Sequence, residues 1–299
     1  MAATMDETDF NGMPAAMPSG AICAVAGQAA RDTQQWAAGY DRLFSAKPFD
    51  PTLYNTVCLC TAFSAPWAAS ADLRMTNRAA IWGFGVDWLI DYVATSRDEV
   101  DDIVARCLEV GDGADPDSDD LLLSLADIRD GLSSSPAFPV LYPVWKDNLA
   151  RFLHAMAREW DWRPESGTGE RPTLDTYLDN SENFGFSFAF VSHWIYTSPP
   201  PSADDIAAIQ EASWAAQRAG RLINDIGSYE RDVKWGDLNA LMLGGGREEV
   251  DEHVTELTRR FREIVIPLRA DHPRLSYYLE RQIDFCVGFY GGADYWGEL

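Results

Sequence analysis

Basic residues are scarce in this chain. Its 299 residues include 24 Lys and Arg against 47 Asp and Glu, which gives a formal net charge of −23 at pH 7. Nucleic-acid binding needs a basic surface that neutralises phosphates, and attachment to an anionic membrane needs a polybasic segment. We therefore expect neither nucleic acid nor a membrane as a partner. An excess of carboxylates favours a solvated surface first and divalent cations second.

Metal-ligand spacings and long apolar runs are lacking too. The 5 cysteines and 4 histidines are scattered, which argues against a zinc site or a disulfide framework. Apolar runs fall short of the ~18 residues that a membrane helix requires. The amino terminus carries Asp6, Glu7 and Asp9 where a signal peptide would carry basic residues. These features lead us to expect a cytoplasmic protein.

Apolar residues recur at intervals of three and four along most of the chain, which is typical of helices. Sustained alternation, the signal of strands, is missing, and so is an Asn-Gly pair flanked by two alternating runs, the signal of a hairpin. We expect an all-α protein of about ten helices, with a disordered tail over residues 1–19 and a single domain over 20–299. The main expected helices cover 21–44, 52–70, 74–94, 119–132, 139–160, 173–197, 202–234, 247–269 and 272–290.

An oxygen-rich helical face occurs near residue 228. Asn224, Ser228 and Asp232 stand four residues apart, and a helix drifts by only about 40° over four residues, so the three side chains share one face. An amide carbonyl, a hydroxyl and a carboxylate are hard oxygen ligands that suit Mg²⁺ when water and phosphate complete its shell. A solvent-facing polar stripe is the alternative, but the flanking residues are apolar and Arg231 adds a cation.

A pair of carboxylates interrupts an apolar helix upstream. Asp87 and Asp91 lie one turn apart in a run that is otherwise rich in Trp, Phe, Leu and Ile. Burying two carboxylates is costly unless they are paired or bind a metal. Surface acids remain an alternative for this pair taken alone, but the presence of both elements in one chain favours a metal cluster.

These two elements resemble the metal-binding motifs of a known family. Residues 221–232 (RLINDIGSYERD), followed by Gly-Asp-Leu-Asn at 236–239, are similar to the second metal motif of bacterial class I terpene synthases, Asn-Asp-x-x-Ser-x-x-x-Glu. Asp87 and Asp91 resemble the family's aspartate-rich motif and lie at its usual place upstream. The resemblance runs from about residue 60 to the carboxyl end and suggests a diterpene synthase in particular.

This resemblance implies a helical bundle around a central apolar cavity, three Mg²⁺ ions and a prenyl diphosphate as substrate. Asp87, with help from Asp91, would hold two ions, and Asn224, Ser228 and Asp232 would hold the third. The ions would neutralise the departing diphosphate, and the remaining carbocation would cyclise in an apolar pocket whose aromatic faces attract it. We expect a monomer or a homodimer.

The chain also departs from the family pattern. Trp88 replaces the usual second aspartate of the first motif, and Asp232 replaces the usual glutamate of the second. Near residues 180–182 the expected diphosphate-sensing arginine is missing, and the C-terminal Arg-Tyr pair is Asp294-Tyr295. We therefore expect Arg231 and Tyr295 to bind the diphosphate.

Aromatic residues beside the two motifs are candidates for the cavity wall, although core packing is the alternative role for each. Gly185 resembles the family's helix-break position, where a backbone carbonyl can face the cation. The candidate pocket residues are Phe84, Trp88, Phe184, Phe186, Phe188, Trp194, Tyr290 and, at the end of the chain, Phe289 and Trp296.

Several activities remain compatible with these features. Geranylgeranyl diphosphate is the favoured substrate and farnesyl diphosphate the second. A chain-elongating prenyltransferase is disfavoured because it needs two full aspartate-rich motifs and more basic residues. A non-catalytic isoprenoid-binding relative and a synthase that ends with water to give a terpene alcohol both stay open.

Overall fold

The computed structural model describes residues 16–163 and 171–296, and all regular elements within these residues are helical. The all-α prediction is therefore confirmed. The α-helices are α1 (Ala16–Ala37), α2 (Asp41–Phe44), α3 (Pro51–Ser64), α4 (Arg74–Trp88), α5 (Arg97–Gly111), α6 (Asp120–Ser133), α7 (Phe138–Asp161), α8 (Leu174–Leu178), α9 (Phe186–Thr197), α10 (Ala203–Trp235), α11 (Gly246–Leu268) and α12 (Pro273–Tyr290).

Local sequence signals set several of these helix boundaries. Ser202 caps α10 by accepting a hydrogen bond from the Asp205 N–H, and the Asp205 carboxylate accepts one from the Ser202 N–H, the capping box that this pair of residues predicts. Helix α3 ends at Ser64 and not near residue 70 as expected, because Ala65 precedes Pro66 and a residue before proline disfavours the helical conformation.

Three other expectations about the helices need correction. Residues 16–19, assigned to a disordered tail, form the first turn of the alanine-rich helix α1; residues 1–15 of that tail lie outside the described part. The range 173–197 is not one helix, because Gly185 adopts φ +68° and separates a short 3₁₀ turn (Ser181–Phe184) from α9. Helix α5 is absent from the expected set, because its exposed face is so acidic that it obscures the buried stripe of Val100, Val104, Cys107 and Val110.

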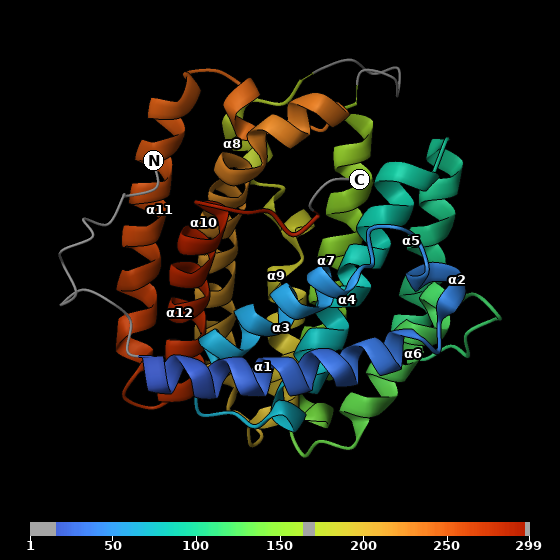
Figure 1. The fold of residues 1–299 in the computed structure, drawn as a ribbon, viewed down its shortest axis with the longest axis vertical. Coiled ribbons are helices and arrows are strands. Elements are labelled where there is room, and N and C mark those ends of the chain that lie inside the picture. Colours follow the sequence, from blue (N-terminus) through green and yellow to red (C-terminus); the bar gives the residue numbers. More distant parts are fainter. Residues whose placement is uncertain (1–15, 164–170, 297–299) are drawn as a thin grey trace.

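The helices surround a central space (Figure 1). Helices α10, α11 and α12 lie side by side on one side of the bundle, and α4, α5 and α7 form the other side. Helices α3 and α9 lie between these groups, and α1 packs across α3 at one end. Segments that are distant in sequence therefore meet in the middle, where α4, α7, α10 and α12 each contribute side chains.

An aromatic cluster fills the core beside this space. Trp82 and Trp145 are fully buried, and the ring of Phe188 lies 5.4 Å from each of them. Phe152 packs on the same cluster, with its ring nearly parallel to that of Phe188 at 6.2 Å. The Trp82 indole N–H donates to the Leu121 carbonyl at 2.9 Å, which satisfies its one polar group. The described helices include none that is long and apolar enough to cross a membrane.

Candidate active site

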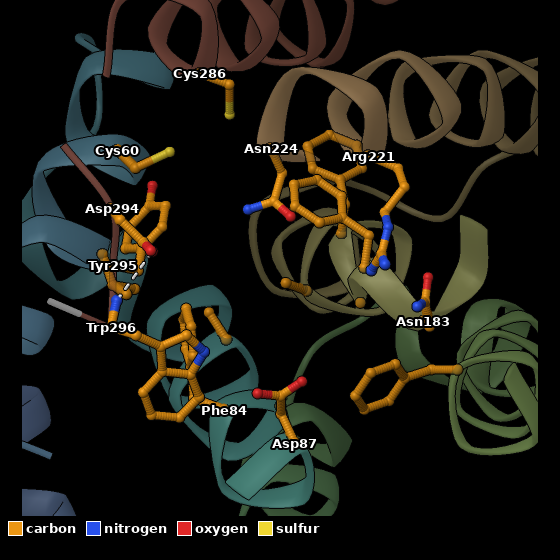
Figure 2. Close-up of a pocket in the computed structure, with 18 of the residues that line it drawn as sticks. Cys60, Phe84, Asp87, Asn183, Arg221, Asn224, Cys286, Asp294, Tyr295 and Trp296 are labelled. Carbon is orange, nitrogen blue, oxygen red and sulfur yellow. Dashed lines mark hydrogen bonds between the residues drawn. The ribbon is translucent and has the colours of Figure 1, made fainter. Parts of the chain in front are cut away.

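A cavity of about 210 Å³ opens in the centre of the bundle. Its wall is formed by α3, α4, α7, α9, α10 and α12 together with the segment that follows α12. Figure 2 shows Asp87 on one side of this cavity, with Asn224 and Arg221 on the other. The two motifs singled out in the sequence therefore face one another across a single space.

The aspartate motif lies where helix α4 changes its winding. Asp87 occupies the last turn of α4, whereas Asp91 lies in a π-helical turn from Leu89 to Val93. Such turns are rare in helices and concentrate at functional sites. Both carboxylates line the cavity. Asp91 pairs with Arg163, whose guanidinium donates to Asp91 Oδ1 at 2.5 Å and to the Asp91 carbonyl at 3.0 Å.

The charge state of Asp87 reflects its surroundings. Burial, and after it the carboxylate of Asp237, raises the pKa of Asp87 to about 7. Burial also raises the pKa of Asp237, which accepts a hydrogen bond from the Tyr92 hydroxyl at 2.9 Å. The protein supplies too little positive charge and hydrogen bonding to offset the burial of Asp87, so a cation bound in the cavity would stabilise the ionised carboxylate.

The second motif presents its oxygen atoms from α10. Asn224 and Asp232 line the cavity, while Ser228 is buried and donates to Asp232 Oδ2 at 2.7 Å. Asn239, in the turn after α10, donates to the same oxygen at 2.7 Å and to the Asp225 carbonyl at 2.8 Å. Two neutral donors therefore hold Oδ2 of Asp232, the last side chain of the motif.

A glycine inside this motif is required by packing. A Cβ atom on Gly227 would lie 2.6 Å from Tyr290 Cβ and 2.7 Å from the Tyr290 carbonyl oxygen. Helix α12 therefore approaches α10 at the point between Asn224 and Ser228, which no larger residue permits. This close approach brings Tyr290 to the cavity wall.

Three arginines supply positive charge to the cavity: Arg163, Arg221 and Arg231. Of these, only Arg231 was predicted from its motif to bind the diphosphate. Arg221 pairs with Glu159 at 2.9 Å and with Asp225 at 3.2 Å, so it lies in a fixed, buried network. Six carboxylates line the same cavity, namely Asp87, Asp91, Glu159, Asp232, Asp237 and Asp294.

The segment that follows α12 closes one side of the cavity. Asp294 forms an ion pair with Arg231, so the residue that replaces the family's arginine neutralises a cation of the second motif. Trp296 packs edge-on against Phe84 at 5.1 Å, and Tyr295 packs against Phe84 at 5.7 Å. Tyr295, expected beside the diphosphate, thus lies among aromatic rings at the cavity wall, and its hydroxyl pKa is raised by burial.

The aromatic candidates divide into two groups. Phe84, Phe184, Phe186 and Tyr290 line the cavity, as does Gly185, whose carbonyl accepts a hydrogen bond from the Ala189 N–H at 3.2 Å. Trp296 also lines the cavity. Phe289 does not line it and packs instead against Tyr290 and Tyr295.

Trp88, Phe188 and Trp194 do not line the cavity, contrary to expectation. Trp88 follows Asp87 by one residue, so it points about 100° away around the helix and stacks on Tyr92. Phe188 lies in the core on another face of α9 from Phe186 and Phe190. Trp194 follows Phe190 by one turn on the same face, but it lies in the core beyond the cavity, with its ring 6.4 Å from that of Phe190.

Several lining residues had no distinctive signal in the sequence. Glu159, Arg163 and Asp237 are single charged residues whose positions depend on how α7 and the turn after α10 pack. Arg163 and Asp237 stand within two short stretches that resemble the family, residues 160–163 and 236–239. This resemblance is the one signal that could have identified them.

The ligand set fits Mg²⁺ only with help from a bound anion. Within residues 16–163 and 171–296, no three His, Cys, Asp or Glu side chains converge to hold a metal by themselves. The candidate oxygen ligands instead lie on two walls, with Asp87 on α4 and with Asn224 and Asp232 on α10. Mg²⁺ commonly keeps several waters and binds through one or two carboxylates plus substrate phosphates, and this arrangement suits that mode.

Comparisons with known proteins agree with this geometry. Residues 78–244 match the family model described as terpene synthase family 2, C-terminal metal binding. The chain is 28% identical over 275 residues to the ent-pimara-9(11),15-diene synthase of Streptomyces sp. (strain KO-3988), covering 89% of this chain and 90% of that protein.

Solved structures show the same fold at low identity. The 2-methylisoborneol synthase of Streptomyces coelicolor A3(2), solved with Mg²⁺ and 2-fluoroneryl diphosphate, superposes with a TM-score of 0.72 at 15% identity, covering 88% of this chain and 91% of that one. The isoprene synthase of grey poplar, solved with three Mg²⁺ ions and dimethylallyl-S-thiolodiphosphate, gives 0.68 at 17% identity, covering 90% of this chain and 55% of that one.

Proposed function

Because the chain belongs to terpene synthase family 2 and is therefore a class I terpene synthase that ionises a prenyl diphosphate, we propose that its substrate is geranylgeranyl diphosphate and its product a cyclic diterpene. The observation that carries this proposal is the division of one cavity into a charged end and an apolar end. Each end suits one half of a prenyl diphosphate.

The charged end suits the diphosphate and its cations. Asp87, with Asp91 beside it, would hold metal on one wall, and Asn224, Ser228 and Asp232 would hold it on the other. We propose three Mg²⁺ ions, the number in the poplar isoprene synthase complex. Bound Mg²⁺ supplies Lewis-acid stabilisation of the negative charge that develops on the departing diphosphate.

Arginines of this chain would complete the diphosphate site. Arg231 is already paired with Asp232 and Asp294, so its positive charge is largely neutralised within the protein. Arg163, just after α7, pairs with Asp91, and Arg221, on α10, pairs with Glu159 and Asp225. All three cavity arginines therefore have carboxylate partners. We propose that Arg163, Arg221 and Arg231 together take the place of the family arginine that is missing near residues 180–182.

The apolar end suits an isoprenoid chain and its carbocation. Phe84, Phe186 and Phe190 present aromatic side chains to the space, and Ala79, Ala80 and Ala189 also line it. Aromatic faces attract a carbocation without reacting with it, and an apolar wall keeps water away from it. The 28% identity with a bacterial ent-pimaradiene synthase over 89% of the chain favours a diterpene substrate over a shorter one.

A second kind of substrate also deserves a test. The string Asp117-Ser118-Asp119-Asp120 has the Asp-x-Asp-Asp pattern of cyclases that begin by protonation, but here it lies outside the cavity, where Asp119 caps α6 and pairs with Arg106. Protonation-initiated ring closure is therefore not expected from this chain. Any rings made in that way would have to arrive with the substrate, as in a bicyclic diterpenyl diphosphate.

The test is an incubation of the purified protein with Mg²⁺ and a panel of diphosphates. The panel contains geranyl, farnesyl, geranylgeranyl and geranylfarnesyl diphosphate and a bicyclic diterpenyl diphosphate. Diphosphate release is measured by a colorimetric assay, and hexane extracts are examined by gas chromatography with mass spectrometry. We expect release and a cyclic hydrocarbon with geranylgeranyl diphosphate.

The control variants separate the site from the surface. Asp87→Asn removes a cavity carboxylate, whereas Asp147→Asn removes an exposed one on α7 whose partner is Arg151. Only the first should abolish release. A higher rate with farnesyl diphosphate or with the bicyclic diphosphate would make that compound the substrate in place of geranylgeranyl diphosphate. A terpene alcohol as product would show that water ends the reaction. Intact substrates throughout would favour the non-catalytic isoprenoid-binding alternative.

A further inference from the structure

Two cysteine thiols meet at the cavity wall. Cys60 lies on α3 and Cys286 on α12, helices that pack against each other. Both residues line the cavity, and each is only 3% exposed. Figure 2 shows the two sulfur atoms on the same side of the cavity, each directed into the space between their helices. The diphosphate site proposed above uses neither thiol.

The surroundings of Cys60 distinguish it from an ordinary buried cysteine. The Gln282 side-chain N–H donates to Cys60 Sγ at 3.1 Å. Interaction with the Cys286 thiol, and after it with the Tyr295 hydroxyl, holds the pKa of the Cys60 thiol below its usual value despite burial. The same contact with Cys60, followed by burial, raises the pKa of Cys286. One sulfur is thus prepared to carry negative charge, and its neighbour keeps the proton.

Other cysteines of the chain provide a contrast. Cys58 also lies on α3, but burial raises its thiol pKa to about 12, and its sulfur contacts Thr33 at 3.8 Å. Burial likewise raises the pKa of the Cys107 thiol on α5. Neither residue lines the cavity. Buried thiols of this kind are chemically inert.

We propose that Cys60 and Cys286 form an oxidisable dithiol, which a small hydroperoxide that enters the cavity converts into a disulfide between α3 and α12. The Cys60 sulfur attacks the peroxide oxygen, the O–O bond breaks, and Cys60 becomes a sulfenic acid as the first water or alcohol leaves. The Cys286 sulfur then attacks the Cys60 sulfur, the S–O bond breaks, and water leaves with the Cys286 proton. Each sulfur gives up one electron, and the peroxide takes up both.

The new bond would change the cavity directly. A disulfide brings its sulfur atoms to about 2.0 Å, closer than any non-bonded contact, so α3 and α12 must move toward each other or their side chains must turn. The bond also removes the Cys60 thiol from its interaction with Tyr295, a residue of the segment that closes the cavity. If the proposed function holds, oxidation should reversibly lower turnover.

The primary test uses no substrate, so its outcome is independent of the proposed function. A Cys23→Ser protein, in which the one exposed cysteine is removed, is treated with hydrogen peroxide under native conditions and then alkylated and digested. We expect a peptide pair linked through Cys60 and Cys286, a mass lower by two hydrogen atoms, loss of two alkylatable thiols, and full reversal by dithiothreitol.

Matched variants identify the thiols involved. Cys60→Ser and Cys286→Ser should each abolish the loss in mass, whereas Cys58→Ser and Cys107→Ser should retain it. Circular dichroism shows whether each variant folds. If a variant does not fold, the linked peptide from the Cys23→Ser protein still shows whether Cys60 and Cys286 form the disulfide. The proposal is overturned if native oxidation leaves Cys60 and Cys286 alkylatable, links other cysteines instead, or carries Cys60 to a sulfinic acid with Cys286 untouched.

Discussion

Substitution of Gly185 by alanine tests how the cavity wall is built. Gly185 has φ +68° and ψ 0°, a left-handed conformation that disfavours a side chain. An added Cβ atom would also lie 3.2 Å from Phe152 Cε2, closer than most such contacts. Phe152 cannot easily retreat, because its ring packs between Trp82 and Phe188. We expect the strain to displace Phe152 in the wall of the cavity.

Gly236 provides the matched control. It has φ +81° and ψ 14°, nearly the same conformation, but its added Cβ would meet no atom within 4 Å. The left-handed conformation costs about 1–2 kcal/mol for alanine, and the loss of chain entropy in the unfolded state returns about 0.4–1 kcal/mol. We therefore expect Gly236→Ala to lose about 1 kcal/mol of unfolding free energy. Gly185→Ala should lose about 2 kcal/mol, because crowding of Phe152 adds to the strain.

The assay combines stability with product analysis. Urea unfolding followed by circular dichroism gives the two free energies, and gas chromatography of the terpene products gives the rate and the product ratio. We expect an altered product pattern from Gly185→Ala and an unchanged one from Gly236→Ala. Equal stability losses together with wild-type products from both variants would refute the role assigned to the Phe152 contact.

Three further predictions concern other parts of the molecule. Asp87→Asn should lower the Mg²⁺-dependent release of diphosphate by about a thousandfold with an unchanged helical signal, because it removes a carboxylate that we propose to hold Mg²⁺. Activity near that of wild type would contradict this assignment. Asn239→Ala should raise the Mg²⁺ concentration needed for half-maximal activity and cost about 2 kcal/mol of stability, because Asp232 loses a charged hydrogen bond; a metal titration and a urea curve measure the two effects. Burial lowers the pKa of His193 to about 4 from an ordinary 6.5. As the pH falls, the unfolded chain therefore binds a proton at this residue before the folded chain does. About 3 kcal/mol of the free energy of unfolding is lost between pH 6.5 and pH 4. His193→Phe should flatten that pH dependence in urea unfolding, and an unchanged slope would assign the loss to other groups.

The sequence predicted those parts of the site that are local in the chain. Asp87 and Asp91, or Asn224 and Asp232, are related by helical spacing alone, so their shared exposure to one cavity follows once the helices exist. The capping pair that begins α10 was predictable for the same reason. Whether these residues bind metal stays a prediction.

Features that depend on tertiary packing escaped prediction. The ion pair between Arg163 and Asp91 joins residues that are 72 positions apart, and no local pattern records it. Trp88 illustrates the opposite error, since proximity to a motif in sequence does not place a side chain on the same helical face. The π-helical turn at Asp91 was likewise invisible, because its residues read as an ordinary apolar helix.

The segment after α12 has a practical consequence for handling the protein. Asp294 pairs with a motif arginine, and Trp296 covers Phe84 at the cavity wall. A purification tag or fusion partner attached close to this end could displace Asp294 and Trp296, which form part of the cavity wall. Catalytic behaviour measured on such a fusion would report on the tag as well as on the enzyme.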